Sequence, residues 1–487
     1  MSNTLLLAID IGTSSFKSAL WDLDGNRIAF AAVSLAMSGD DGGRHEAESA
    51  QWLRAFEECC RRLDSPASAG RAGALAAVKI IVISGNGPSL TPVLAEPSLG
   101  AGGLCLSAAP ARLWLDRRAT AAAAEVSALM GAYVDPCFYL PKALGIKNDE
   151  SELYERTKFF LGCPEYLACA LTGEARTVFP SEGFDRWFWN AEILEKLKLN
   201  AEKFPPFIRP GDIYGTIIPS VAARLGFAHN VPVAAGGPDF FAAILGAGVI
   251  SPGQVCDRAG TSEGINVCTE KQIIDGRLMS YGHPVQPFWN LSGIISTTGK
   301  AVEWGRGLLG IESYADFYAL AETAEAGAGG LVFLPYLAGE RAPVWDPAAR
   351  GVLRGLGLSS GRAEFARSVL EGICFAIRDV ITVMEETGAA VGELRIAGRA
   401  GADENGIFNQ IKADITGKEV LVMAQKEAEL AGLAIIGACA LGSYASFAEA
   451  AAALVRVEKR LEPDAKKAAL YEGLFQKYRE TYTVPRR

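Results

Sequence analysis

The chain has 487 residues, 49% of them hydrophobic and 21% charged, which is typical of a globular protein long enough for two or more domains. Its formal net charge of −9 gives no support for binding to nucleic acid or to an anionic membrane, so neither partner is expected. No apolar run reaches the ~20 residues that a membrane-spanning helix needs, and no basic region precedes the first apolar run as in a signal peptide.

The cysteines and histidines do not follow the spacing of a metal site. There are ten cysteines and three histidines, and no cysteines are paired as CxxC. The cysteines are scattered, mostly through apolar stretches. We therefore expect free, buried thiols in a reducing compartment and a cytoplasmic protein.

The first half of the chain begins with three predicted strands. They cover residues 5–10, 16–21 and 27–33, with a turn at Gly12–Ser15 and the hairpin pair Asp24-Gly25 between them. Further elements follow in chain order: a helix over 48–63, a strand over 78–84, helices over 117–130 and 151–161, and a strand over 231–235. The sequence Gly236-Gly237-Pro238-Asp239 is then expected to begin a helix that runs to about 245.

The second half of the chain repeats the alternation of strands and helices. Its predicted elements are a helix over 364–387 ended by Gly388, a strand over 394–397, a helix over 409–416, a strand over 420–423 and a helix over 429–441. This alternation predicts an α/β fold of two domains with mixed sheets, residues 1–248 and 249–487.

Two glycine-threonine-serine turns are the most informative motif. Glycine lets the backbone approach a ligand closely, and the hydroxyl and N–H groups can face an anion. Each turn joins two strand-like runs and lacks the Gly-Lys-Ser or Gly-Lys-Thr of a Walker loop. We therefore predict a nucleotide phosphate site built from two hairpin turns, whose residues are Gly12, Thr13 and Ser14 in the first half and Gly260, Thr261 and Ser262 in the second.

Two charged residues flank the first turn. Asp10 ends the first strand, where ligands of open α/β sheets bind, and its carboxylate would repel a phosphate unless a divalent cation lay between them. Asp10 is therefore a candidate Mg²⁺ anchor through water; the alternative is an aspartate that caps the turn. Lys17 could reach a phosphate, or could simply be a solvated lysine on a strand.

Asp239 is the candidate catalytic base. It follows two glycines and a proline at a strand-to-helix junction. Phosphoryl transfer to an alcohol needs a carboxylate that orients the hydroxyl and accepts its proton. The alternative is a helix cap, a common role for aspartate at this position.

A candidate acceptor site is formed by residues beside loops. Amides, carboxylates and an aromatic face are typical of sugar binding, although the pattern alone favours a core position for Trp114. The candidate residues are Asn86, Gly87, Pro88, Trp114, Asp116, Asp239 and Phe240.

Together these segments resemble the FGGY carbohydrate kinases of the actin/Hsp70-like ATPase superfamily, along nearly the whole chain. The run from Asp10 to Ser15, with Lys17, is similar to the family's first phosphate loop, and Ala259–Ser262 to its second. The most specific match is the C-terminal signature, which is found at every spacing in Gly351–Leu356, Glu364-Phe365 and Ser368–Glu371.

The resemblance implies two ribonuclease-H-like domains, with ATP and sugar in the cleft between them. It implies that Asp239 deprotonates the sugar hydroxyl, that Thr13 and Thr261 hold ATP phosphates and that Asp10 organises Mg²⁺. Gly398 and Gln410 fit the family's adenosine side. A homodimer is a family-level expectation.

Departures from the family pattern leave the acceptor open. Gly85-Asn86 stands in place of Gly-Gln, Gly145 in place of a tryptophan, and the segment after Gly398 is longer. A ketopentose such as xylulose is the first hypothesis. Glycerol is disfavoured because Pro88-Ser89 replaces an arginine-glutamate pair, while gluconate, ribulose, erythritol and a heptulose remain open. The rivals are a sugar-independent ATPase and a silent sugar-binding regulator.

Overall fold

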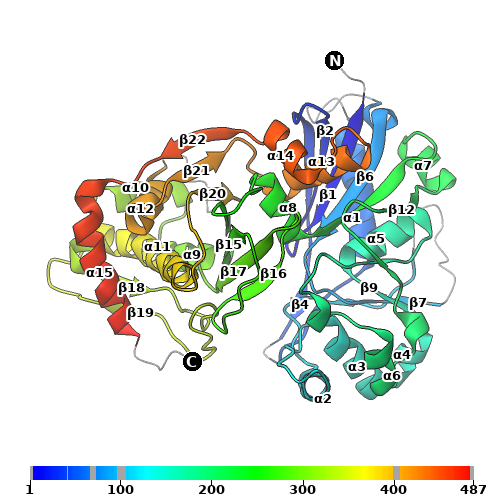
Figure 1. Ribbon diagram of the computed structural model, residues 1–487, viewed down its shortest axis with the longest axis horizontal. Helices are drawn as coiled ribbons and strands as arrows, with labels where there is room; N and C mark the ends of the chain where they lie inside the picture. Colours follow the sequence, from blue (N-terminus) through cyan, green and yellow to red (C-terminus); the bar gives the residue numbers. More distant parts are fainter. Residues whose placement is uncertain (1–3, 41, 66–72, 96–105, 399–405, 483–487) are drawn as a thin grey trace. The chain divides into compact units, whose positions relative to one another are not determined.

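The structure is a computed structural model that describes residues 4–40, 42–65, 73–95, 106–398 and 406–482. The chain divides into two compact units, each built on its own mixed β-sheet (Figure 1). Unit 1 is Met1–Leu245 with Glu429–Leu454, and unit 2 is Gly246–Ala428 with Val455–Arg487. Residues 429–454, which the sequence places in a domain over 249–487, therefore belong to unit 1.

The sheet of unit 1 has the strand order β12-β13-β6-β1-β2-β3. The first three strands form an antiparallel meander, and β6 and β13 run parallel to β1. The strands are β1 (Leu5–Ile11), β2 (Ser15–Asp22), β3 (Arg27–Ser34), β6 (Val78–Gly85), β12 (Ile213–Thr216) and β13 (Pro232–Pro238). Every residue of β1 is buried, as expected of a strand covered on both faces, and the predicted strands 5–10, 16–21, 27–33 and 78–84 are confirmed.

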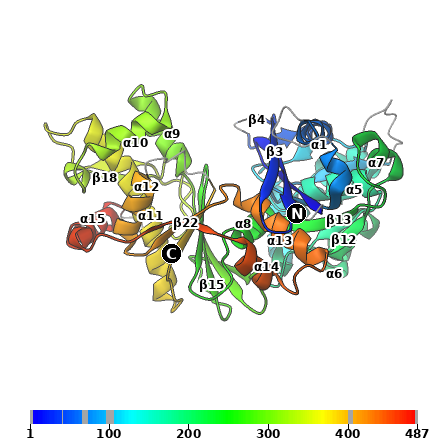
Figure 2. The same cartoon turned by 90° about the horizontal axis from the view of Figure 1, so that it is seen from above.

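Helices cover both faces of this sheet. Helices α1 and α5 pack on one face, where they share a hydrophobic core with Leu7 and Ile9 of β1. On the other face Gly437 of α13 lies against Val82 and Leu6 (Figure 2). The helices are α1 (Ala50–Leu63), α2 (Thr120–Met130), α3 (Tyr139–Asp149), α4 (Ser151–Arg156), α5 (Cys163–Thr172), α6 (Ala191–Lys196), α7 (Pro219–Leu225), α8 (Asp239–Gly246), α13 (Ala428–Ala440) and α14 (Phe447–Leu454).

Smaller sheets complete unit 1 and correct one sequence prediction. They pair β4 (Ser38–Gly39), β5 (His45–Ala47) and β8 (Ala111–Arg112); β7 (Thr91–Leu94) and β9 (Thr157–Leu161); and β10 (Thr177–Val178) and β11 (Phe207–Ile208). The helix predicted over 151–161 is wrong in its second half, because β9 pairs with β7 instead. The β-branched and aromatic side chains of β9 favour a strand.

Unit 2 repeats the arrangement of unit 1. Its sheet has the order β16-β17-β15-β14-β20-β21-β22, with an antiparallel meander of β14, β15 and β17 and the parallel strands β20 and β21 beside β14. The same order of three antiparallel and two parallel strands makes both units ribonuclease-H-like. The strands are β14 (Val255–Ala259), β15 (Glu263–Thr269), β16 (Met279–Gly282), β17 (Trp289–Ile295), β18 (Val332–Leu334), β19 (Val352–Arg354), β20 (Leu394–Ala397), β21 (Val420–Met423) and β22 (Val457–Leu461).

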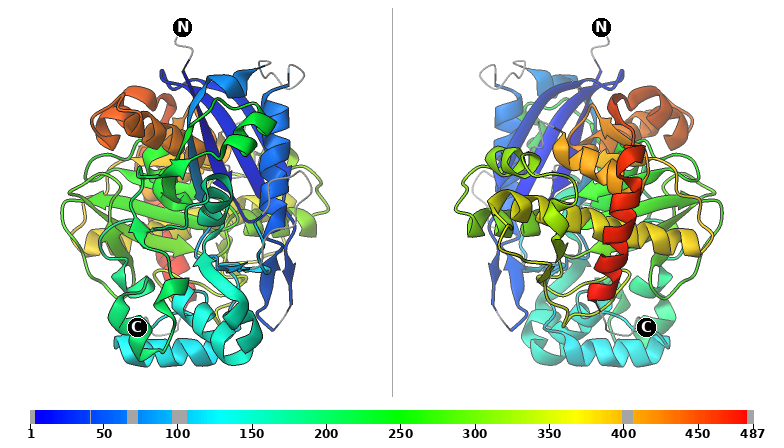
Figure 3. Two further views of the ribbon diagram at one scale, coloured as in Figure 1. Left: turned by 90° about the vertical axis from the view of Figure 1, so that its right-hand side faces the viewer. Right: turned by 90° about the vertical axis from the view of Figure 1, so that its left-hand side faces the viewer.

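The helices of unit 2 pack around α11, which is buried along most of its length. Phe375 of α11 contacts Tyr471, Phe475 and Tyr478 of α15. Helix α15 packs across α11 (Figure 3). The helices are α9 (Gly299–Leu308), α10 (Tyr314–Glu322), α11 (Arg362–Glu386), α12 (Ile407–Thr416) and α15 (Ala468–Thr481). Among the helices in the described ranges, none is long and apolar enough to cross a membrane.

Candidate active site

Three parallel strands of unit 1 end side by side and carry the main candidate residues. Ile11 at the end of β1 pairs with Gly85 of β6, and Gly85 pairs in turn with Pro238 of β13. Asp10 is the second-last residue of β1, and Asn86 and Asp239 directly follow β6 and β13. All three therefore lie at the carboxyl ends of neighbouring strands, where ligands of open α/β sheets bind.

The first glycine turn is a tight connection between β1 and β2. The Gly12 N–H donates to the Ser15 carbonyl at 2.9 Å, and a Cβ on Gly12 would lie only 2.9 Å from the same oxygen, which explains the glycine. Ser14 is exposed and Thr13 is half-buried. Lys17 lies directly opposite Asp10 in the antiparallel register, so the two residues share one face of the sheet.

Asp239 is the first residue of α8 and directly follows β13. Gly236 and Gly237 stay in the strand rather than beginning the helix as predicted, because the pairing of β13 with β6 continues to Pro238 after a register shift. A Cβ on Gly236 would lie 2.3 Å from Leu433 Cδ2, and Gly237 has a φ of +80°. The glycine pair therefore allows the close packing and the backbone turn at the end of β13 that place Asp239 at the start of α8.

The carboxylate of Asp239 is half-buried, and one of its oxygens has a local partner. Oδ1 accepts the N–H of Phe240 at 2.7 Å. The Phe240 ring stacks on Phe184, with centroids 6.0 Å apart and planes 18° apart. The aspartate thus lies in the first turn of α8 and directly after a strand.

Asn86 is bound to the end of β1. Its backbone N–H and its Nδ2 both donate to the carbonyl of Ile11, at 2.8 and 2.9 Å. Its Oδ1 is buried and has no hydrogen-bond partner among the described residues. This oxygen is an acceptor without a donor at the carboxyl edge of the sheet.

Trp114 reaches the first glycine turn. Its Nε1–H donates to Thr13 Oγ1 at 2.9 Å and its ring is half-buried, so the core position that the pattern favoured is wrong. The indole joins the predicted acceptor residues to the predicted phosphate turn.

Asp116 has a different environment. It is buried, and Oδ2 accepts the His45 N–H at 3.0 Å and Arg118 Nη2 at 2.8 Å. Burial alone would raise the pKa of Asp116, but the hydrogen bonds from Arg118 and the His45 amide hold that pKa below its ordinary value. Its oxygens therefore bind the protein itself, an arrangement that favours a structural role over the predicted sugar contact.

One buried residue near the loop Asn86–Pro88 was not among the predicted site residues. Lys142 of α3 is fully buried, and its Nζ donates to the carbonyls of Pro88, Leu113 and Arg112 at 2.8, 2.6 and 3.3 Å. Burial lowers the pKa of Lys142 to about 7. Below that pH the ammonium has one N–H for each carbonyl.

The second glycine turn joins β14 to β15 in unit 2 and is held by α9. Gly299 N–H donates to the Gly260 carbonyl at 3.0 Å, and Thr298 N–H donates to the Thr261 carbonyl at 3.2 Å. A Cβ on Gly299 would lie 2.3 Å from the Gly260 oxygen. Thr261 is exposed and Ser262 half-buried, so the turn presents its hydroxyls outward.

Gly398 lies beside this turn, whereas Gln410 has other contacts. Gly398 follows β20, has a φ of +91°, and would place a Cβ 2.5 Å from the Ala259 carbonyl. Gln410 Nε2 donates to Asp414 Oδ1 at 2.8 Å and to the Glu462 carbonyl at 2.9 Å. The lengthened segment after Gly398 lies outside the described residues.

A fully buried ion cluster lies next to the second turn. Lys412 of α12 donates to Asp257 of β14 and, at 2.8 Å, to Glu263, the residue after Ser262. Burial, and then the charge of Glu263, raises the pKa of Asp257. Burial alone would lower the pKa of Lys412, but the two carboxylates raise it above its ordinary value. Lys412 therefore stays charged and ties both strands of the hairpin to α12.

The contact between Gly299 and Gly260 gives a testable prediction. A methyl group on Gly299 must displace the Gly260 carbonyl, so we expect Gly299→Ala to weaken binding of Mg-ATP at least tenfold, measured by titration calorimetry on folded protein. Gly307→Ala in the same helix is the control, because a Cβ there meets nothing within 4 Å. Equal ATP affinity in the two variants would remove the second turn from the nucleotide site.

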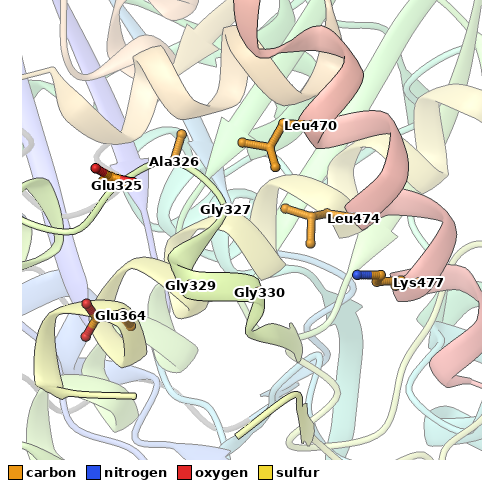
Figure 4. A pocket seen from close by; sticks show the side chains of 9 residues that line it. All are labelled: Glu325, Ala326, Gly327, Gly329, Gly330, Glu364, Leu470, Leu474 and Lys477. Carbon is orange, nitrogen blue, oxygen red and sulfur yellow. The ribbon is translucent and has the colours of Figure 1, made fainter. Parts of the chain in front are cut away.

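Unit 2 also has a pocket of about 350 Å³ between α15 and the connector Glu325–Gly330 (Figure 4). It is lined by Glu325, Ala326, Gly327, Gly329, Gly330, Glu364, Leu470, Leu474 and Lys477. None of the predicted site residues lines this pocket.

Comparison with known proteins gives consistent results for the whole chain. The model of the FGGY family of carbohydrate kinases, N-terminal domain, matches residues 5–246, and that of the C-terminal domain matches residues 258–441. Xylulose kinase of Bacillus subtilis (strain 168) is 27% identical over 495 residues, 98% of this chain and 96% of that protein. Gluconokinase of the same strain is 26% identical over 479 residues, 91% of this chain and 88% of that protein. Ligand-bound xylulose kinase from Lactobacillus acidophilus shares the fold, with a TM-score of 0.84, 24% identity, and coverage of 98% of this chain and 97% of that chain.

Proposed function

The chain belongs to the FGGY family of carbohydrate kinases, and on that premise we propose that it transfers the γ-phosphate of ATP to a hydroxyl group of a ketopentose, with xylulose as the first candidate. The observation that carries the choice of xylulose is the likeness to xylulose kinase over 98% of this chain. The protein is a phosphotransferase with an alcohol group as acceptor.

Unit 1 provides the residues for the acceptor. We assign to Asp239 the role of general base, because its carboxylate stands at the carboxyl edge of the sheet beside the β1 and β6 ends. We also assign Asn86, whose Oδ1 has no hydrogen-bond partner among the described residues, to the acceptor site. Trp114 and Phe240 offer aromatic faces on which the carbon skeleton of a sugar can rest.

The two glycine turns provide the residues for the phosphates. Close backbone packing at Gly12 in the first turn, and of Gly299 against the second, fixes the shape of both turns. Gly12 and Gly260 have no side chain that would keep an anion from the backbone. Thr13 and Thr261 would donate their hydroxyls, with Gly398 beside the second turn. We assign each turn, within its own unit, to the binding of a phosphate group of ATP.

A buried carboxylate fits the predicted metal. Asp10 is 5% exposed and lies one residue before the end of β1, next to the first turn. It would hold Mg²⁺ through water, since Mg²⁺ keeps much of its hydration shell. When bound, the ion would neutralise charge on the phosphates of ATP.

The acceptor is identified by measuring ADP release with Mg-ATP across xylulose, ribulose, gluconate, erythritol, a heptulose and glycerol. We expect xylulose to give the highest kcat/KM. Highest turnover with gluconate would replace xylulose by the acceptor of the gluconokinase relative. Hydrolysis that no sugar stimulates would contradict the proposal and favour an ATPase.

A further inference from the structure

The buried side chain of Lys142 packs against the acceptor loop, Asn86–Pro88. Lys142 is 0% exposed and binds the carbonyl of Pro88 together with those of Arg112 and Leu113. None of the three carbonyls belongs to α3. The lysine therefore joins two segments that are separate in the chain: the acceptor loop, and the segment that leads into Trp114.

We propose that Lys142 is a positioning residue that holds the acceptor loop against Trp114 and thereby sets the affinity for the sugar. The proposal rests on the proposed function only in naming the sugar as the ligand. The Lys142 side chain is 0% exposed, so it is not accessible to a reactant.

Other hydrogen bonds extend this connection to the first glycine turn. Leu90 and Arg112 exchange two backbone hydrogen bonds, at 2.8 and 2.9 Å, just beyond the acceptor loop. Asn86 is bound to Ile11, and Trp114 is bound to Thr13. These contacts thus connect the lysine to the predicted acceptor residues Asn86 and Trp114 and to the predicted phosphate residue Thr13.

The same face of α3 presents a second side chain to the loop. Tyr139 lies three residues before Lys142, and residues three apart share a helix face. A Cβ on Gly87 would lie 3.7 Å from the Tyr139 hydroxyl, an ordinary contact. The first turn of α3 therefore lies against the loop, and the Lys142 Nζ is the atom that donates a hydrogen bond to it.

Loss of the ammonium affects one carbonyl more than the others. The Leu113 carbonyl also accepts the Asp116 N–H at 3.0 Å, and the Arg112 carbonyl accepts the Leu90 N–H. Pro88, in the acceptor loop, gives up the 2.8 Å bond from the ammonium. Replacing Lys142 with a neutral, apolar side chain should therefore loosen the acceptor loop more than the segment around Arg112 and Leu113.

The test compares Lys142→Met with Lys203→Met, a matched change elsewhere in unit 1. Lys203 is 8% exposed and donates to the carbonyls of Thr157 and Glu155, away from the acceptor loop. Thermal unfolding establishes that both variants are folded at the assay temperature. We expect Lys142→Met to raise the KM for the sugar at least tenfold and the KM for ATP less than twofold, and Lys203→Met to leave both within twofold. A sugar KM in Lys142→Met equal to that of Lys203→Met would overturn the proposal.

Hydrogen exchange makes the test independent of turnover. If wild type phosphorylates neither xylulose nor gluconate, the proposed acceptors fail, but the positioning role is still measurable. Peptides over 84–94 and 108–116 should then exchange faster in Lys142→Met than in wild type and Lys203→Met. Unchanged exchange in both peptides would contradict the role. If Lys142→Met does not fold, Lys142→Gln, which keeps two N–H donors, is measured in the same way.

Discussion

Replacing Asp239 with asparagine is expected to lower kcat roughly 100- to 10,000-fold, the range that a positioned general base contributes. Asparagine keeps an oxygen that can accept the Phe240 N–H, so the start of α8 should remain intact. It cannot take a proton from the sugar hydroxyl at neutral pH. ATP affinity, measured by titration calorimetry, should change less than twofold.

A second pair of variants separates chemistry from capping. Asp239→Ala also removes the acceptor for Phe240, and a lost helix cap costs about 1 kcal/mol. Asn190 caps α6, because its Oδ1 accepts the Ile193 N–H at 2.9 Å. Asn190→Ala removes this cap and should lower the free energy of unfolding by a similar amount, with no change in kcat. Wild-type kcat in Asp239→Asn would show that Asp239 is a cap and nothing more.

Lys412→Met should lower the free energy of unfolding by about 3–5 kcal/mol. The three side chains of the cluster are at most 1% exposed, and the methionine would leave Asp257 and Glu263 buried without their cation. Because Glu263 follows the second turn directly, we also expect weaker ATP binding. Urea unfolding monitored by circular dichroism checks the first effect and calorimetry the second.

Two further variants test whether the loss comes from uncompensated charge. Adding Asp257→Asn and Glu263→Gln to Lys412→Met removes both orphaned carboxylates and should recover part of the stability. Lys418→Met breaks a pair with Glu385 that is more exposed, so its cost should stay within about 1 kcal/mol. A Lys412→Met protein no less stable than Lys418→Met would contradict the structural role of the cluster.

Local patterns were sufficient for the elements that position the turns. The Asp24-Gly25 hairpin formed as predicted, because Gly25 adopts a φ of +81° and Asp22 Oδ1 accepts the N–H of Asn26 at 2.8 Å. The long helix α11 ends before Gly388, whose φ is +86°. In both cases a glycine takes the positive φ that the local turn or helix end requires, so the neighbouring residues in the sequence are enough to predict it.

The buried lysine contacts beside the candidate site residues could not be predicted from the sequence. The partners of Lys142 lie 29 to 54 residues away in the chain, and those of Lys412 are 149 and 155 residues away. A lysine in an apolar helix has no local feature that shows which carbonyl or carboxylate it will meet. The small-residue helix α13 was predicted, but not that it packs in unit 1, because Gly437 meets Val82 only once the sheet has formed.

The most direct test of the kinase assignment is the fate of the γ-phosphate. Wild type and Asp239→Asn are incubated with γ-labelled Mg-ATP and xylulose, and the label is followed into sugar phosphate and inorganic phosphate by mass spectrometry. We predict that wild type places the label on xylulose, one phosphate per ADP formed, and that Asp239→Asn forms little of this product. Label released by wild type only as inorganic phosphate, with every sugar of the panel, would contradict the assignment as a sugar kinase.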